Sequence, residues 1–167
     1  MKTTITVLLA AALALTTHPI RAAEPKALVL TQAEAPVVIT KYQNRYTRSD
    51  KADENGVSHK VDYKNRTDRR ILAIEFGFVE FTVWNEHIET LVANDLDAVG
   101  GGKSGDGSWL HDPTTGFLFH TGIAYVSRVR FEDGEIWTAD PEDIAAHMRS
   151  IESSFSVEML RPKTPDR

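Results

Sequence analysis

Residues 71–84 read ILAIEFGFVEFTVW, and this stretch decides the fold. Its β-branched and aromatic residues are typical of a strand packed against other elements. Apolar residues alternate with other residues up to Phe78, and after Phe78 the apolar positions shift by one residue. Such a shift predicts a bulge or a bend, which Gly77 would allow. The stretch is therefore predicted to be the central strand of the core.

Strands are also predicted on both sides of this stretch. Val57, His59, Val61 and Tyr63 alternate with polar residues, which is the period of a half-buried strand. Residues 36–46 and 117–131 have the composition of strands. Residues 94–116 contain six of the ten glycines and are predicted to be the longest loop, either mobile or functional.

The sequence after this strand region predicts a hairpin and one helix. Asp133-Gly134 is a favoured two-residue turn with a positive φ at Gly134, and it would pair Phe131 with Ile136 and Arg130 with Trp137. Asp140 is the expected N-cap of a helix over about 141–153, with Pro141 at its first position. An apolar stripe at helical spacing, beginning at Ile144, would pack on the sheets. Residues 161–167 are expected to be a tail.

The N-terminus indicates export. Lys2 precedes a short apolar run, and small residues follow at Ala22 and Ala23, so residues 1–22 are predicted to be a signal peptide and 23–35 a loose arm that could add an edge strand. The product would be periplasmic or secreted, without membrane insertion after cleavage. A net charge of −5 argues against nucleic acid as a partner, because phosphate binding needs a basic surface. With 0 cysteines, the chain must be held by packing and hydrogen bonds alone.

These elements predict a mainly β protein, with residues 36–160 forming a two-layer, immunoglobulin-like antiparallel β-sandwich and one C-terminal α-helix. Residues 61–76, VDYKNRTDRRILAIEF, resemble the strand-turn-strand start of small bacterial envelope sandwich domains of fibronectin or FxLYD type. Residues 129–137, VRFEDGEIW, look like their closing hairpin. Because these domains mostly lack an assigned catalytic activity, the resemblance implies a fold and a location more than a function.

The predicted ligand site lies in the glycine-rich loop, residues 100–116. That loop carries an aromatic residue and several polar residues, as recognition loops on rigid sandwiches do. The candidate ligand-binding residues are Lys103, Asp106, Trp109, His111 and Asp112. The expected partner is a protein or glycan of the cell envelope, and Trp109 could alternatively be a core residue.

A metal-dependent hydrolase is the alternative to a binding module. His111, Asp112 and His120 flank one loop and could converge on zinc, since imidazole and carboxylate both suit that ion. Solvated loop histidines are commoner, so no cofactor is expected. Glu75 and Glu80 lie within the apolar stretch, where a raised pKa could make either an acid, but each is expected to face solvent. The favoured function is a non-catalytic binding or structural module of the envelope.

Overall fold

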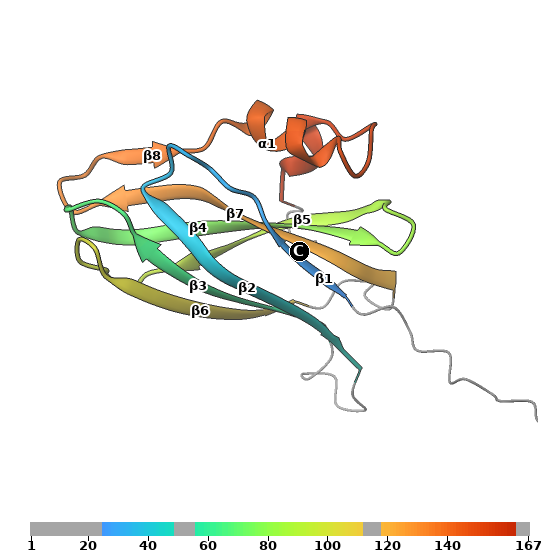
Figure 1. Ribbon diagram of the computed structural model, residues 1–167, viewed down its shortest axis with the longest axis horizontal. Helices are drawn as coiled ribbons and strands as arrows, with labels where there is room; N and C mark the ends of the chain where they lie inside the picture. Colours follow the sequence, from blue (N-terminus) through green and yellow to red (C-terminus); the bar gives the residue numbers. More distant parts are fainter. Residues whose placement is uncertain (1–24, 49–55, 112–117, 163–167) are drawn as a thin grey trace, which may run out of the picture.

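The computed structural model describes residues 25–48, 56–111 and 118–162. Two β-sheets pack face to face, and a short helical layer covers the outer side of one of them (Figure 1). The strands are β1 (Lys26–Val29), β2 (Val37–Thr47), β3 (Gly56–Asn65), β4 (Ile71–Thr82), β5 (His87–Asp95), β6 (Ser104–His111), β7 (Phe119–Phe131) and β8 (Ile136–Thr138). The helices are α1 (Pro141–Met148) and the 3-10 turn η3 (Val157–Leu160).

The larger sheet has the order β1-β7-β4-β5, with β8 paired to β7, and the smaller sheet has the order β2-β3-β6. All pairings are antiparallel except that of β1 with β7, which is parallel. The mainly β, two-sheet architecture predicted from the sequence is therefore confirmed. Residues 26–29, expected in a loose arm, form the edge strand β1.

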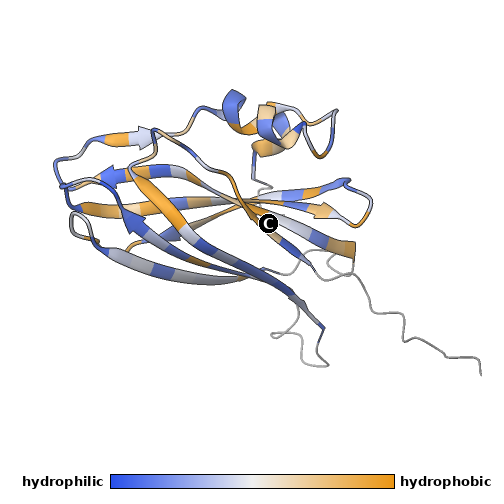
Figure 2. Ribbon diagram, viewed as in Figure 1, coloured by the Kyte–Doolittle hydropathy of each residue, from blue (hydrophilic) through white to orange (hydrophobic). Residues whose placement is uncertain are grey.

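Strand β4 is central because both of its faces are buried. Ile74, Phe76 and Phe78 pack into the core between the two sheets, whereas Val79 and Phe81 pack into a second core beneath α1 and the C-terminal segment. The shift in the apolar pattern after Phe78 thus marks burial on two faces as well as local bulges. In Figure 2, apolar segments run along β4 and β7.

The position of Gly77 has a different reason from the predicted one. The pairing irregularities of β4 lie at Glu75/Phe76, at Glu80/Phe81 and near its two ends. A Cβ added at Gly77 would lie 2.1 Å from the ring of Tyr125. Gly77 therefore makes room for an aromatic side chain on the neighbouring strand.

Part of the predicted loop is a strand. Residues 104–111 form β6, which pairs with β3 from Lys64↔Ser104 to Val57↔His111. Its glycines weaken the sequence signal for a strand, yet they have a packing role. A Cβ added at Gly105 would collide with the Tyr63 ring, and one at Gly107 with the Trp109 indole.

The predicted hairpin forms with a different register. The Phe131 amide donates to the Glu135 carbonyl, so the loop has three residues, and Arg130 pairs with Ile136. The two-residue turn expected from Asp133-Gly134 needs positive φ at both positions. Only Gly134 has it, at φ 92°, because Asn85 is the sole non-glycine residue with positive φ in the described chain. The predicted positive φ at Gly134 is confirmed.

Gly134→Val is expected to lower the free energy of unfolding by about 1–3 kcal/mol, because a β-branched residue is strained at this φ. Nothing lies within 4 Å of an added Cβ, so the effect comes from the backbone alone. Urea denaturation of wild type and variant measures it, with Gly100→Ala as a control at a glycine without positive φ. An unchanged midpoint for Gly134→Val would contradict the observed turn.

Helix α1 begins where the sequence predicts. The Asp140 side chain accepts a hydrogen bond from the Glu142 amide at 2.9 Å, and Pro141 occupies the first turn. The helix ends at Met148, five residues before the predicted end, and Ile144 and Met148 pack into the second core. Among the described residues, no helix is long and apolar enough to cross a membrane.

Candidate functional site

A chain of hydrogen bonds lies buried between the two sheets. The Tyr42 hydroxyl lies 2.7 Å from His59 Nδ1, and His59 Nε2 lies 2.8 Å from Glu80 Oε1. His59 and Glu80 are 0 % exposed, so this polar chain is closed off from solvent. The His59 ring stacks on Phe78 at a centroid distance of 4.4 Å and meets Phe119 edge-on.

The donor and the acceptor of each hydrogen bond between Tyr42, His59 and Glu80 can be assigned. Burial raises the pKa of Tyr42, which keeps its hydroxyl protonated. The Asn44 amide donates to the Tyr42 oxygen at 3.4 Å, so the hydroxyl proton is directed to His59 Nδ1. His59 then accepts at Nδ1 and donates from Nε2 to the Glu80 carboxylate. In this arrangement His59 orients Glu80.

The prediction that Glu80 faces solvent is wrong. Glu80 shares the inner face of β4 with Phe76 and Phe78, at a spacing of two residues. The shift of the apolar positions to Val79 and Phe81 concealed this in the sequence, because the second buried face of β4 was not expected. The prediction is also wrong for Glu75, which is 9 % exposed and bonded to Ser127 and Arg128. Glu75 alternates with Ile74 and Phe76, so it lies on the other face of β4, where Ser127 and Arg128 cover it.

A second histidine–carboxylate pair lies next to Glu80. Glu89 stands opposite Glu80 in the β4–β5 pairing, and its Oε1 lies 2.8 Å from His111 Nε2. One potential ligand atom from each of Glu80, Glu89 and His111 lies within 4.8 Å of the others. We call these three residues the inter-sheet cluster. His111 is 25 % and Glu89 11 % exposed at the side chain, so the inter-sheet cluster has a route to solvent.

The structure separates the ligand residues predicted for residues 100–116. Trp109 lies in β6 and packs against Phe76 and Phe78, at ring distances of 5.7 and 5.8 Å. Asp106 is on the exposed side of β6, and Lys103 lies in the turn that precedes it. Asp112 lies outside the described residues. The loop position predicted for Trp109 is wrong because residues 104–111 form a strand.

Of the predicted zinc ligands, His111 joins the inter-sheet cluster, while His120 is not part of any such group in the described chain. His120 is the extra residue of a bulge in β7, opposite the Phe81–Thr82 step. Sequence reasoning missed His59 and Glu89, and it considered Glu80 only as a solvent-facing acid, because the convergence of these residues depends on the strand pairing.

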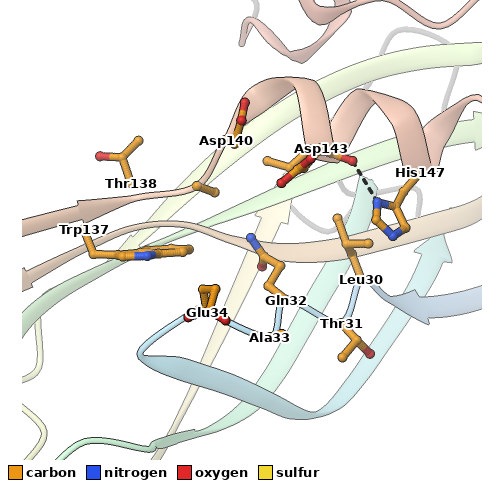
Figure 3. A pocket seen from close by; sticks show the side chains of 13 residues that line it. Leu30, Thr31, Gln32, Ala33, Glu34, Trp137, Thr138, Asp140, Asp143 and His147 are labelled. Atoms are coloured by element: carbon orange, nitrogen blue, oxygen red, sulfur yellow. Dashed lines mark hydrogen bonds between the residues drawn. The ribbon is translucent and has the colours of Figure 1, made fainter.

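A groove on the other side of the larger sheet is the second candidate site. It has a volume of about 510 Å³ and lies between the segment 30–35, the end of β8 and helix α1 (Figure 3). Its apolar lining includes Leu30, Trp137 and Ile144. Glu34, Asp140, Asp143 and His147 add polar groups, and Lys and Arg are absent from the residues that line it.

Several of these polar groups already have partners. Asp140 caps α1, and His147 Nδ1 bonds the Asp143 carbonyl at 2.7 Å (Figure 3). Gln32 bonds both backbone groups of Val126 and so anchors the segment that forms one wall. The exposed carboxylates of Glu34, Asp140 and Asp143 together give the groove its negative charge, since the amide hydrogen bond to Asp140 does not cancel the charge of that side chain.

Glu75 and Arg128 form a third charged feature, on the larger sheet. Burial alone would raise the pKa of Glu75, but hydrogen bonds from Arg128 and Ser127 hold it below its usual range. Because the pKa of Glu75 is lower in the folded protein than in the unfolded chain, its ionised form stabilises the fold at pH values above the unfolded-state pKa. This stabilisation is lost as the pH falls through the folded-state pKa. Its size is modest, because Arg128 is 57 % exposed.

Glu75→Gln is expected to lower the free energy of unfolding at pH 7 by about 1 kcal/mol or less. This loss should shrink as the pH falls below about 4, because the unfolded chain then takes up a proton at this carboxylate before the folded protein does. Urea denaturation at pH 7 and pH 3 measures both values, with Glu132→Gln as a control at an exposed ion pair. An equal loss at both pH values would contradict the role of the Glu75 charge.

Comparisons with known proteins bear on the fold alone. No protein-family model matches the chain, and no curated protein matches it. A crystal structure of a hypothetical protein from Peptoclostridium difficile 630 is similar, with a TM-score of 0.52, 11 % identity, and coverage of 75 % of this chain and 95 % of that one. A structural-genomics target matches with a TM-score of 0.36 and 10 % identity, over 62 % of this chain and 80 % of that one. The first likeness shows a shared fold, and the second carries no argument.

Proposed function

We propose that this protein is an exported, non-catalytic binding or structural module of the bacterial cell envelope, periplasmic or secreted, built on an immunoglobulin-like sandwich. The predicted signal peptide and the resemblance of residues 61–76 and 129–137 to envelope domains support this proposal. The mainly β, two-sheet architecture agrees with it. The observation that carries the binding role is the groove beside α1.

The groove suits a particular ligand chemistry. Its volume of about 510 Å³ lies within the range of sites for small groups, and Trp137 offers an aromatic surface. Glu34 and Asp143 supply negative charge, and Lys and Arg are absent from the lining. A basic group beside an apolar one complements these features, since a cation is attracted both by carboxylates and by an indole ring. The proposed ligand is a segment of an envelope protein that presents a Lys or Arg side chain next to an apolar side chain.

The walls of the groove are also held in place by contacts with the rest of the protein. The wall at 30–35 is anchored by the two Gln32–Val126 hydrogen bonds, and α1 is anchored by Ile144 and Met148 in the second core. Side chains on anchored elements lose less freedom when a ligand binds. The proposed site therefore differs from the predicted one at residues 100–116, while the proposed class of partner stays the same.

The alternative, a metal-dependent hydrolase using His111, His120 and Asp112, has less support. The structure brings His111 to the inter-sheet cluster without His120, and Asp112 lies outside the described residues. A hydrolase also needs an open site for substrate, and Glu80 and His59 are fully buried. We therefore favour binding over catalysis.

The test uses pairs of short synthetic peptides that differ only by Lys in place of Glu beside a leucine. We expect the Lys peptides to shift the NMR signals of the Trp137 indole and of α1, and the Glu peptides to leave them unchanged. Trp137→Ala should weaken binding about tenfold or more, because truncating an aromatic anchor costs over 1 kcal/mol.

Ile136→Ala is the matched control, since Ile136 is exposed on the same strand and does not line the groove. The double variant Glu34→Gln with Asp143→Asn should lower the affinity for the Lys peptides several-fold. It should also reduce the salt dependence of their binding. Equal responses to Lys and Glu peptides, or signals that shift only on the β2-β3-β6 sheet, would contradict the proposed site.

A further inference from the structure

The inter-sheet cluster has more acceptor atoms than donors. Glu80 Oε1 is bonded to His59, but Glu80 Oε2 is buried without a hydrogen-bond partner. Asn44 Oδ1, in the same network, is also buried without one. Buried polar atoms are nearly always paired, so an orphaned carboxylate oxygen needs a physical reason.

The charges in the inter-sheet cluster also need balancing. Glu80 and Glu89 face each other across two paired strands, and two carboxylates close together in a low-dielectric interior repel each other strongly. His59 lies between Tyr42 and a single oxygen of Glu80, so the second oxygen of that carboxylate has no hydrogen-bond donor. A divalent cation would balance both carboxylates at once.

We propose that Glu80, Glu89 and His111 bind one divalent first-row transition-metal ion, of which Zn²⁺ is the probe. The ion would take Glu80 Oε2, a Glu89 carboxylate oxygen and a His111 ring nitrogen. This site lies between the sheets, apart from the groove beside α1, and does not depend on the proposed binding of basic segments.

The geometry fits such an ion after a small adjustment. Bonds of about 2.0–2.2 Å in a tetrahedral site hold ligand atoms roughly 3.3–3.6 Å apart. One atom from each of the three residues already lies within 4.8 Å of the others, and His111 Nε2 and Glu89 Oε1 are 2.8 Å apart. An ion therefore has to part this pair by less than about 1 Å and to draw the more distant atoms together by at most about 1.5 Å. Both side chains reach the solvent, which allows the movement and gives the ion its route.

The surrounding residues act as a support for these ligands. His59 holds Glu80 Oε1 at 2.8 Å, and Tyr42 holds His59 at 2.7 Å, which leaves Oε2 for the ion. Metal-ligating side chains are commonly oriented by such outer hydrogen bonds. A Cβ added at Gly122, opposite Glu80 in β7, would lie 2.5 Å from the Tyr42 hydroxyl and from Asn44 Nδ2, so this glycine leaves space for the network.

The donor set selects the class of ion. One imidazole and two carboxylates suit zinc and its neighbours in the first transition row. Calcium takes six to eight oxygen ligands, which three residues with one imidazole do not supply. Magnesium is excluded on similar grounds, because it prefers oxygen ligands and keeps several waters in an octahedral shell.

The experiment measures binding of Zn²⁺ and Co²⁺ to the full chain, expressed with its own N-terminal segment, without a polyhistidine tag and stripped of metal by a chelator. We expect calorimetry to give one Zn²⁺ per chain, and Co²⁺ to give the visible absorption bands of a low-coordinate site. Zn²⁺ should raise the melting temperature, because an ion that binds only the folded state stabilises it. Millimolar Ca²⁺ or Mg²⁺ should not displace it.

Glu89→Gln and His111→Gln change partly exposed side chains and are expected to keep the fold, as circular dichroism can verify. Each should weaken Zn²⁺ binding at least tenfold and remove the Co²⁺ bands. The matched controls are Glu86→Gln, three residues from Glu89, and His120→Gln, on β7 outside the cluster, and both should bind like the wild type. Glu80→Gln should also lose Zn²⁺ binding while it keeps the shape of the side chain.

Three results would overturn the proposal. One is the absence of saturable binding of Zn²⁺ or Co²⁺ by the wild-type chain. Another is wild-type affinity in both Glu89→Gln and His111→Gln, which would place the ion on other histidines. The third is displacement of Zn²⁺ by millimolar Ca²⁺ or Mg²⁺, which would assign the site to a different class of ion.

Discussion

Replacing His59 with alanine is expected to lower the free energy of unfolding by about 3–5 kcal/mol in the presence of a chelator, because it breaks a buried hydrogen-bonded pair. Glu80 Oε1 would lose its partner, and the Tyr42 hydroxyl would be left with only the 3.4 Å contact from Asn44. Both groups are buried, so water cannot replace the imidazole without opening the space between the sheets. Urea denaturation followed by circular dichroism measures the change.

The control is a double variant, His59→Met with Glu80→Met, which removes both partners and leaves apolar side chains of similar volume. This variant should recover much of the lost stability, because replacing a buried polar pair by apolar groups is often neutral or stabilising. If His59→Ala alone lowered the free energy of unfolding by less than about 1 kcal/mol, water would have to reach Tyr42 and Glu80 in solution, contrary to their burial here.

Phe78→Ala is expected to cost about 3–5 kcal/mol, since it removes a fully buried aromatic side chain from the centre of the inter-sheet core. Phe78 stacks with Tyr42 and His59 and contacts Trp109 at 5.8 Å. The cavity would therefore lie beside the polar chain, and the side chains around it can close it only in part.

Thermal unfolding and urea denaturation measure the Phe78→Ala loss, with Leu110→Ala as the matched control. Leu110 lies on β6 and is 52 % exposed, so its truncation should change stability by less than about 0.5 kcal/mol. Similar losses for both variants would contradict the packing of the two sheets around Phe78.

The sequence predicts the elements that are controlled by local chemistry. The cap at Asp140 and the alternation from Val57 to Tyr63 were both predicted and are both observed, because each depends on residues close together in the chain. The positive φ at Gly134 belongs to the same group. The register of that hairpin was wrong by one residue because a three-residue turn and a two-residue turn share the Asp-Gly signal.

The sequence could not predict features that depend on pairing between distant strands. Gly105 in β6 leaves space for the ring of Tyr63, a reason that appears only after β6 is paired with β3. The inter-sheet cluster joins three strands, and its members lie between 9 and 31 positions apart in the chain. No local spacing marks such a set, and the shift of apolar positions after Phe78 makes Glu80 look solvent-facing until both faces of β4 are known to be buried.

The parallel pairing of β1 with β7 has a consequence for the time course of folding. Gln32, just after β1, bonds Val126, which lies 94 residues away in the sequence. Contacts between such distant segments form late, because the chain first loses the entropy of closing a long loop. We expect hydrogen exchange pulses during refolding to protect the β1 amides after those of β4 and β5, and earlier protection of β1 would contradict this order. A chain built in this way cannot complete its larger sheet until β7 has been synthesised, because both β1 and β4 pair with that strand near the end of the sequence.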